Sequence, residues 1–249
     1  MVFQIQLAGR VIEIHTLYEL TYNRCKNYII SDKALIEPEI IVNISQNDLD
    51  DEEKRILTYQ KNGSTKDVLV YTPEQIETRV IYRRITEELL QYNTILMHGS
   101  VIATKGNGFM FTAPSGVGKT TRTRLWIDNI SDSIVVNGDK PLIKVSSESV
   151  YACGTPWGGK EGWNNNTIVP LRAVFLLERI EKGEQTSIAE VRLGEAFVAL
   201  AHQTYQCGEP DALQKTLRLL REFDGKVKFY KFRSAPTLEA VRLAYETAK

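Results

Sequence analysis

The stretch Gly108-Phe-Met-Phe-Thr-Ala-Pro-Ser-Gly-Val-Gly-Lys-Thr120 decides the fold of this chain. Its first residues have the apolar pattern of a strand, and residues 120–129 after it suit a helix. Between them, Gly116 and Gly118 permit a tight backbone path that points several N–H groups at one spot, next to the positive end of the helix dipole. Strand, glycine-rich loop and helix in this order predict a binding site for phosphate groups.

The loop also predicts roles for its own side chains. Lys119 would reach the outer phosphates of a nucleotide, and the hydroxyl group of Thr120 would hold Mg²⁺. Ala113 stands where the usual pattern has glycine, which is a mild departure because that residue mainly turns the chain. A glycine-rich turn without a ligand is the alternative. The expected nucleotide contacts of the loop are Pro114, Ser115, Gly116, Val117, Gly118, Lys119, Thr120 and Thr121.

Composition narrows the class of protein. The chain has 249 residues with 31 basic and 31 acidic side chains, so its zero net charge argues against a nucleic-acid partner. Its 3 cysteines are scattered without metal-ligand spacing and are typical of reduced thiols. No apolar run approaches the ~20 residues of a membrane helix, and the first residues lack the pattern of a signal peptide. We expect a cytoplasmic protein without a membrane partner.

The N-terminal part of the sequence predicts a small β-rich lobe over residues 1–70. Short alternating or apolar runs favour strands, and acidic or turn-forming clusters favour loops. Residues 71–249 then form the expected catalytic domain. The expected strands of the lobe are residues 3–7, 11–14, 28–30 and 40–44, with an acidic loop at 47–53 and a turn-rich break at 61–65.

The second part of the sequence begins with a clear start signal for a helix. Thr72-Pro-Glu-Gln75 combines an N-cap, a proline at the first helical position and a capping box, which predicts the start of a helix. Residues 95–104 and 108–112 read as strands joined by Lys105-Gly-Asn-Gly108, a hairpin signal. The strand that feeds the loop should therefore pair antiparallel with its predecessor. Further strands are expected at 133–136, 150–153, 172–177 and 227–232, and helices at 194–206, 210–222 and 236–248.

Two side chains near the loop are candidates for the chemistry of phosphoryl transfer. Asp139 comes just past the apolar strand 133–136, where a carboxylate could hold Mg²⁺ or act as a base toward a hydroxyl group. An ordinary turn aspartate is the alternative. His98 lies in the strand before the hairpin and could pair with Asp139 or share a proton with it, whereas a lone strand histidine is more often a core residue.

The polar, glycine-rich segment 151–166 is a second candidate region. Trp157 or Trp163 could stack on a base or on the substrate, Lys160 could contact a phosphate, and Glu161 could bind a metal. The alternative is a loop that two buried indole rings anchor. Arg172, at the start of the next expected strand, could clamp the phosphates or simply lie on the surface.

The order of these elements resembles the catalytic domain of HPr kinase/phosphorylase. His98-Gly99, the turn at Gly106–Gly108, Ser115-Gly-Val-Gly-Lys119 and Asp139 carry the resemblance over residues 95–140. It implies an α/β fold whose P-loop kinase core is of the HPr kinase and phosphoenolpyruvate carboxykinase type. It also implies ATP as phosphoryl donor and a serine as acceptor. By this resemblance His98 assists the catalytic base, Lys119 and Thr120 contact phosphate and Mg²⁺, and Asp139 is one of two aspartates.

Over nearly the whole chain, the sequence is more similar to HPr-kinase-related kinases of lasso-peptide biosynthesis. The β-rich start, residues 137–140, the loop Gly154-Thr-Pro-Trp-Gly-Gly-Lys-Glu161 and residues 170–178 carry this resemblance. It implies a precursor peptide as partner, phosphorylated on its C-terminal serine. The hexamers of HPr kinase relatives make a homo-oligomer an open expectation.

One departure from the HPr kinase pattern bears on mechanism. Gly138-Asp139 stands where that family has a pair of aspartates, so one carboxylate is missing. Either Asp139 serves both metal and acceptor, or another group such as Glu161 takes the second role. We expect an ATP-dependent serine kinase. The alternatives are a small-molecule kinase or carboxykinase-like enzyme, and a nucleotide sensor that has lost catalysis through Gly138.

Overall fold

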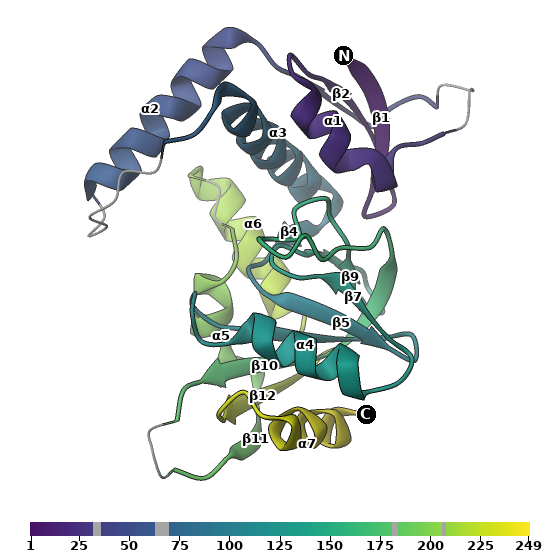
Figure 1. The fold of residues 1–249 in the computed structure, drawn as a ribbon, viewed down its shortest axis with the longest axis vertical. Coiled ribbons are helices and arrows are strands. Elements are labelled where there is room, and N and C mark those ends of the chain that lie inside the picture. The colour runs from purple at the N-terminus through teal and green to yellow at the C-terminus, as the bar shows by residue number, and fades with distance from the viewer. Residues whose placement is uncertain (32–35, 63–69, 181–183, 206–207) are drawn as a thin grey trace. The chain divides into compact units, whose positions relative to one another are not determined.

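The structure is a computed structural model with a mixed α/β fold (Figure 1). Contacts between residues divide it into an N-terminal unit, Met1–Glu88, and a C-terminal unit, Leu89–Lys249. The expected lobe of residues 1–70 stops before helix α3 (Pro73–Leu89), which falls almost entirely in the N-terminal unit. None of the helices in the described ranges has the length and apolarity that a bilayer crossing requires. The structure describes residues 1–31, 36–62, 70–180, 184–205 and 208–249.

A three-stranded sheet forms the β part of the N-terminal unit. Strand β1 (Val2–Leu7) pairs antiparallel with β2 (Arg10–His15), and β3 (Ile40–Asn43) pairs parallel with β2. These strands confirm three of the four expected runs. The fourth, residues 28–30, is wrong as a strand, because helix α1 (Glu19–Cys25) continues into the 3₁₀ turn η1 (Lys26–Tyr28) and leaves only a single bridge at Ile29.

The expected acidic loop at residues 47–53 is also wrong, because helix α2 (Gln46–Asn62) covers it. The carboxylate of Asp48 accepts hydrogen bonds from the backbone N–H and hydroxyl group of Ser45 just before the helix, at 2.8 and 2.7 Å. Acidic side chains in a first turn suit the positive end of the helix dipole. The turn-rich break at 61–65 lies in the end of α2 and, from residue 63 on, outside the described residues.

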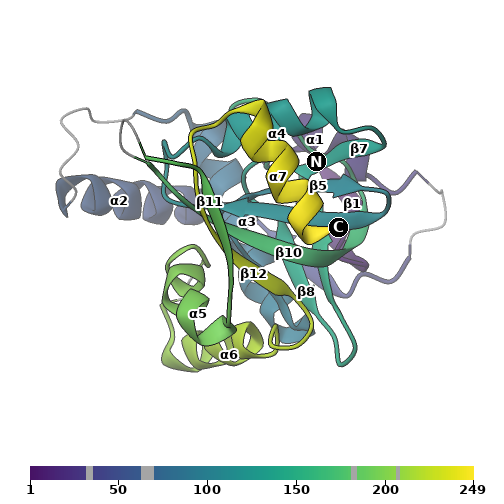
Figure 2. The same cartoon turned by 90° about the horizontal axis from the view of Figure 1, so that it is seen from below.

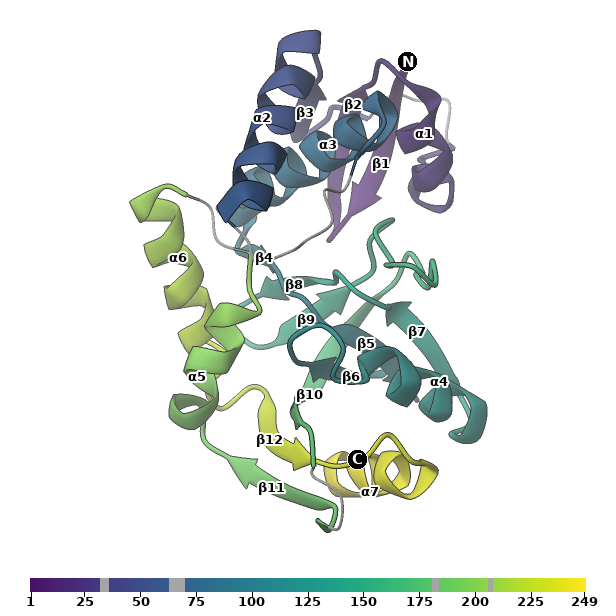
Figure 3. The ribbon, with the colours of Figure 1, turned by 60° about the vertical axis from the view of Figure 1, so that its left-hand side comes forward.

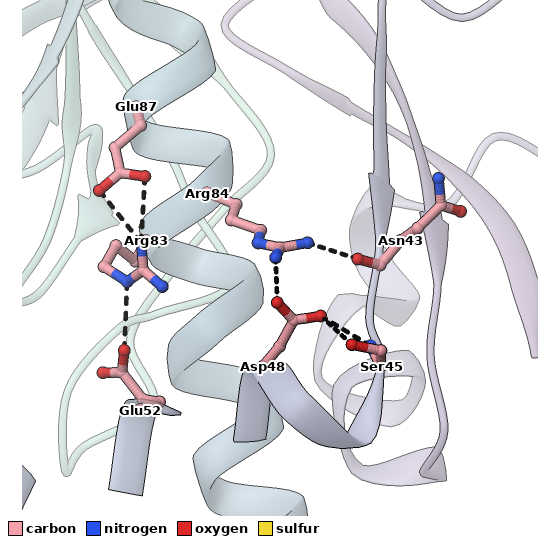
Figure 4. A network of polar contacts seen from close by, with 7 residues as sticks. All are labelled: Asn43, Ser45, Asp48, Glu52, Arg83, Arg84 and Glu87. Atoms are coloured by element: carbon pink, nitrogen blue, oxygen red, sulfur yellow. Dashed lines mark hydrogen bonds and ion pairs between the residues drawn. The ribbon is translucent and has the colours of Figure 1, made fainter. Parts of the chain in front are cut away.

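Two arginines of α3 neutralise these acidic side chains (Figure 4). Arg83 donates to Glu52 of α2 at 3.1 Å and to Glu87 one turn along α3 at 3.2 Å. Arg84 pairs with Asp48 and donates to the backbone carbonyl of Asn43 at 2.5 Å. Helix α2, whose first half is rich in acidic residues, is therefore stabilised by two arginines of α3. The expected capping box of α3 is confirmed by the reciprocal bonds between Thr72 and Gln75.

The C-terminal unit is organised by one curled sheet that runs in the order β4-β8-β9-β10-β6-β5-β7, with β12 beside β10 and β11 beside β12. Strands β5 and β6 form the expected antiparallel hairpin, whereas β6 and β10 run parallel. Strands β8 and β11 were outside the expectation. The bounds are β4 Thr94–Leu96, β5 Ser100–Thr104, β6 Asn107–Thr112, β7 Ser133–Asn137, β8 Leu142–Val145, β9 Val150–Cys153, β10 Ile168–Glu178, β11 Ser187–Val191 and β12 Lys228–Arg233.

Helices cover both faces of this sheet, with α4 and α7 on one face and α5 and α6 on the other (Figures 2 and 3). The alternation along β6 explains the two layers. Phe109 and Phe111 pack against Trp126 of α4 at ring distances of 5.3 and 5.6 Å, whereas Met110 belongs to the core under α5 and α6. The expected helices are confirmed as α4 Lys119–Asn129, α5 Leu193–His202, α6 Pro210–Arg221 and α7 Leu238–Ala248, with the turn η2 at Leu90–Tyr92.

The expected single strand at residues 95–104 is wrong in one respect that concerns the site. The chain leaves β4 at Leu96, crosses to another part of the sheet and begins β5 at Ser100. A Cβ atom on Gly99 would lie 2.9 Å from the carbonyl oxygen of Phe111, so only glycine allows this close crossing. His98 therefore lies in a break between strands rather than within one.

Glu77 of α3 is fully buried in the N-terminal unit and holds the backbone just before another helix. One carboxylate oxygen accepts hydrogen bonds from the backbone N–H groups of Leu17 and Tyr18 at 2.5 and 3.3 Å, just before α1. The other oxygen has no partner among the described residues. Burial raises the pKa of Glu77, and the two N–H groups oppose this change only in part.

The variant Glu77→Gln should therefore gain stability relative to the wild type as pH rises. A folded-state pKa above the unfolded value means that the folded protein binds more protons in that window, so the wild type loses stability with increasing pH. Glutamine keeps an acceptor for the two amides and does not titrate. Urea unfolding at a series of pH values from acid to neutral measures the difference. Glu77→Ala should cost about 1–3 kcal/mol at every pH, since it leaves both N–H groups without an acceptor. A constant difference between Gln and wild type contradicts the assignment.

Candidate functional site

The loop between β6 and α4 has the backbone geometry that its glycines suggest. Gly116 and Gly118 have φ angles of 81° and 97°, in the left-handed region where other residues are strained. Gly118 is the N-cap of α4, and Lys119 is the first helical residue. The loop therefore turns the chain sharply and ends at the positive end of a helix.

The side chain of Lys119 folds back onto its own loop. Its ammonium group donates to the carbonyl oxygens of Ala113 at 2.7 Å and Pro114 at 3.2 Å. The side chain is largely buried, and burial lowers the pKa of Lys119, while the negative charge of Asp139 acts in the opposite direction. The charges of Lys119 and Asp139 therefore lie close enough to influence each other's pKa.

Two arginines bind three more carbonyl oxygens of the loop. Arg122, one turn into α4, donates to the carbonyl oxygens of Val117 at 2.9 Å and Gly118 at 3.3 Å. Arg179, immediately after β10, donates to the carbonyl oxygen of Gly116 at 2.5 Å. Together with Lys119, these cations draw the loop carbonyls to the rear and side of the loop.

The direction of the carbonyls fixes the direction of the N–H groups. In a trans peptide the C=O of one residue points opposite to the N–H of the next. The N–H groups of Ser115, Val117, Gly118 and Lys119 therefore point away from the three cations. In the part of the chain that the structure describes, none of these four donates to a protein acceptor. Donors without a protein acceptor at the start of a helix are suited to an anion.

The expected charge clamp is Arg172, but the strand register places it at the wrong end of β10. Leu171 is level with Gly108 at the start of β6, whereas Leu176 is level with Thr112, just before the loop. Four to five residues of strand separate the two positions, about 15 Å at roughly 3.3 Å per residue. Arg179 is the arginine of this strand that reaches the loop. Parallel strands end at the same edge of a sheet, so an arginine just after the end of β10 lies at the same edge as the loop after β6. The sequence does not show that β6 and β10 are paired, and for that reason it does not single out Arg179.

Asp139 and His98 lie together, as expected. Nε2 of His98 is 3.4 Å from Oδ1 of Asp139, and the backbone N–H of Gly99 donates to the carbonyl oxygen of Asp139 at 2.9 Å. The pKa of Asp139 is lowered, chiefly by its contact with the His98 ring, with Lys140 and Lys119 adding to the effect and burial opposing it. Asp139 is therefore a carboxylate at neutral pH.

Gln203, which the sequence did not suggest, orients His98. Its Oε1 atom lies 2.9 Å from Nδ1 of His98, and its backbone carbonyl accepts from the N–H of His98 at 2.6 Å. Because Oε1 only accepts, Nδ1 carries a proton, and Nε2, the atom that faces Asp139, donates to that carboxylate when it carries a proton as well. The two residues are separated by 105 positions, and no local pattern links them.

Asn137 fixes the turn that carries Asp139. Its Oδ1 accepts from the backbone N–H groups of Asp139 at 2.9 Å and Lys140 at 2.6 Å, and its amide group donates to the carbonyl of Thr155 at 3.0 Å. Asn137 is fully buried, so these bonds are shielded from water. The turn and the start of segment 154–166 thus form one hydrogen-bonded unit.

Glycines fill the place of a second carboxylate. A Cβ atom on Gly138 would lie 3.1 Å from the carbonyl oxygen of Gly158 and 3.3 Å from Cβ of Trp163. A Cβ atom on Gly159 would lie 2.8 Å from Cβ of Asp139. Segment 154–166 therefore packs directly on the Gly138-Asp139 turn, at a distance that larger residues prevent.

The other candidates of segment 151–166 are distributed along its surface and interior. Trp157 is buried within the segment, which favours its role as an anchor. Glu161 is exposed and pairs with Arg124 of α4 at 2.9 Å, and the same guanidinium lies 5.3 Å from the ring centre of Trp163. Lys160, next to Gly159, is exposed.

The structure also bears on the expected metal ligands. Thr120 is exposed at the first turn of α4, so its hydroxyl group is open to a ligand. Within the described residues, no three or more His, Cys, Asp or Glu side chains gather in a group that could hold a metal ion. The donor set here is one hydroxyl group and the carboxylate of Asp139, with Glu161 engaged by Arg124. Hydroxyl and carboxylate oxygens are ligands that fit a hydrated Mg²⁺.

Comparison with known proteins gives one family. A family model described as "SynChlorMet cassette protein ScmC" matches residues 62–219, more than half of the chain. No curated protein matches the sequence. Among solved structures, the Hpr(Ser) kinase/phosphatase from Coxiella burnetii is similar, with a TM-score of 0.37 and 9% identity over 61% of this chain and 93% of that chain.

Gly159→Ala should disturb the Asp139 turn, and Gly162→Ala in the same segment is the matched control. Both glycines have positive φ angles, 76° and 67°, so both alanines add backbone strain of about 1–2 kcal/mol. Only at position 159 does the new Cβ atom meet Asp139, since nothing lies within 4 Å of one at 162. Urea unfolding should show the larger loss for Gly159→Ala. Imidazole NMR signals of His98 should shift in that variant and stay in place in Gly162→Ala; equal behaviour of both variants argues against the close packing.

Proposed function

The chain belongs to the ScmC family of SynChlorMet cassette proteins, and we propose that it acts as an ATP-dependent serine kinase. One observation carries the proposal. Four N–H groups of the loop have no acceptor in the described part of the chain, and three cations bind the carbonyl oxygens of the peptide units to which they belong. A chain of phosphate groups carries dense negative charge and suits several neighbouring N–H donors. ATP is the common phosphoryl donor with such a chain.

The loop supplies binding and charge stabilisation. The amides of residues 115–119 receive the phosphate oxygens, while Pro114, Thr120 and Thr121 complete the contact surface. Lys119 exchanges its loop carbonyls for the outer phosphates, and Arg179 supplies the charge clamp that the sequence assigns to Arg172. Preorganised donors of this kind stabilise charge that develops on the equatorial oxygens of the transferred group. Lys160 is exposed near Asp139 and is the remaining candidate contact.

Thr120 and Asp139 would hold Mg²⁺, and Glu161 is the third candidate ligand once it leaves Arg124. When bound, the ion neutralises phosphate charge and orients the terminal phosphate. The protein's part is to hold two oxygen donors at the edge of the loop. Because Gly138 has no room for a second aspartate, Asp139 must also serve the acceptor, or Glu161 must share the metal.

Asp139 and His98 act on the acceptor hydroxyl. The carboxylate of Asp139 accepts the proton as the hydroxyl oxygen forms its bond to the γ-phosphorus, the bond from that phosphorus to the bridging oxygen breaks, and ADP leaves. His98, held by Gln203, keeps Nε2 toward Asp139 and supports the carboxylate in that role. The Gln203 contact is the part of this arrangement that fixes the ring.

A peptide is the proposed acceptor, namely the C-terminal serine of a lasso-peptide-type precursor. The support is the resemblance in segments 154–161 and 170–178, together with a family description that names a cassette protein. The core would then be of the HPr kinase and carboxykinase type, in a cytoplasmic enzyme that acts alone or as a homo-oligomer. The segment between Trp157 and Trp163 and the C-terminal helices are the candidate surfaces for the peptide.

Two alternatives differ in what happens to the phosphate. A small-molecule kinase or carboxykinase-like enzyme would use the same loop with a sugar, alcohol or oxaloacetate. A nucleotide sensor is favoured by one observation, the packing of Gly158 and Trp163 into the place of the missing carboxylate. ATP binding without transfer to any acceptor would identify it.

Intact-mass analysis of a serine-terminated precursor peptide, incubated with the protein, ATP and Mg²⁺, tests the proposal. The matched control is the same peptide ending in alanine. We expect a gain of one phosphoryl group only on the serine form. No gain on either peptide while ATP still binds would favour the sensor, and turnover of a small molecule would favour the other alternative.

Asp139→Asn should retain ATP binding and lose transfer, because the amide keeps the shape of the side chain but cannot accept the proton. Lys119→Ala should lose several orders of magnitude in transfer rate, since each 1.36 kcal/mol of lost transition-state stabilisation is about tenfold. Isothermal titration and a single-turnover assay separate binding from transfer. Unimpaired turnover of Asp139→Asn would exclude the carboxylate as base.

A further inference from the structure

Arg122 is a buried cation directly behind the proposed phosphate loop. Its side chain is fully buried and donates to the loop carbonyls of Val117 and Gly118 on one side. On the other side it donates to the backbone carbonyl of Ser234 at 2.5 Å and to the Ser234 hydroxyl at 3.0 Å. A Cβ atom on Gly118 would lie 2.8 Å from the guanidinium, so glycine at this position lets the arginine close on the loop.

No carboxylate of the described residues compensates the charge of Arg122. Within the described residues, Arg122 takes part in no ion pair, and its Nε atom has no hydrogen-bond partner. Its other neighbour is the ring of Phe232, whose centre lies 5.8 Å from the guanidinium carbon. Burial lowers the pKa of Arg122 to about 10, so the group remains protonated at neutral pH. A buried charge without a partner is costly, and proteins rarely keep one unless a ligand or counter-ion balances it.

The position of Arg122 identifies the missing counter-charge. The peptide units that accept from its guanidinium present their N–H groups, those of Gly118 and Lys119, to the opposite side of the loop. An anion on those N–H groups is separated from the guanidinium by the thickness of one peptide layer. Two charges at such a short distance and shielded from water interact much more strongly than two charges at a solvated surface.

Arg122 differs in this respect from the other two cations of the loop. Lys119 has a flexible side chain and Arg179 is exposed, so each can leave its carbonyl and touch a ligand. Arg122 is fixed between the loop and Ser234 and cannot reach the ligand side. Any contribution that it makes to binding acts through the loop, as a charge.

We propose that Arg122 is the built-in counter-charge of the anion site, a guanidinium that attracts polyphosphate from behind the loop without touching it. The inference rests on the proposed phosphate site and adds that the charge of Arg122, beyond its hydrogen bonds, sets the affinity. It also implies selectivity for the more highly charged ligands, because an electrostatic contribution grows with the number of phosphate charges.

The test compares Arg122→Lys with Arg122→Gln, since both keep a donor for the loop carbonyls and only lysine keeps the charge. Titration calorimetry with AMP, ADP, ATP and inorganic tripolyphosphate gives the affinities. We expect Lys to bind ATP and tripolyphosphate about tenfold to a hundredfold more tightly than Gln, with a smaller ratio for ADP and the smallest for AMP. Arg242→Gln, which removes an exposed positive charge from α7, is the control and should bind all four ligands as the wild type does.

The other outcomes are equally decisive. Equal affinities of the Lys and Gln variants, or a ratio that is the same for all four ligands, would show a purely structural arginine and overturn the proposal. If Arg122→Gln does not fold because the bonds to Ser234 are lost, Arg122→Lys alone decides the question: affinities for ATP and tripolyphosphate close to those of the wild type support the role of the charge, and an equal loss for all four ligands overturns it. If the wild type itself binds neither ATP nor tripolyphosphate, the proposed function fails first, and that result is distinct from the others.

Discussion

The C-terminal unit depends on the direction of a few peptide units in the loop after β6. Lys119, Arg122 and Arg179 hold the loop carbonyls, so the N–H groups between them face outward and find no protein acceptor among the described residues. A loop without these restraints would satisfy its own amides or turn them to water. The packing of Trp126 on Phe109 and Phe111 then fixes α4 against the sheet, which keeps the last of these amides at the start of a helix.

The turn that carries Asp139 is held by hydrogen bonds and by the close packing of glycines, whereas the loop after β6 is held by positively charged side chains. Asn137 holds the turn through both ends of its amide group, and Gly158 and Gly159 let the following segment pack on it. This packing occupies the volume that a second carboxylate would need. The chain thus has one acidic group at the loop and a close-packed wall beside it, and the proposed chemistry must be carried by that single group with His98.

What the sequence predicts well is local. The loop, the hairpin and the capping box each lie within a few neighbouring residues, and the structure has all three in the predicted order. The failures are at positions that distant residues control. In the helix over residues 47–53, Asp48 and Glu52 pair with Arg84 and Arg83 of α3. Gln203, at the end of α5, and Arg179, after β10, reach the site through contacts with residues far away in the sequence, which no local pattern specifies.

The contacts that shape the loop differ in the sequence separation of their partners, which has a consequence for the way the site is assembled during folding. The contacts of Lys119 and Arg122 with the loop span only four to six positions along the chain, so they cost little loop-closure entropy and form early. The bond from Arg179 spans 63 positions and that from Gln203 to His98 spans 105. A growing chain can therefore form the loop contacts of Lys119 and Arg122 before synthesis reaches the residues that hold Gly116 and orient the histidine. In the proposed kinase, the loop would then take shape before the residues proposed for phosphoryl transfer are in place.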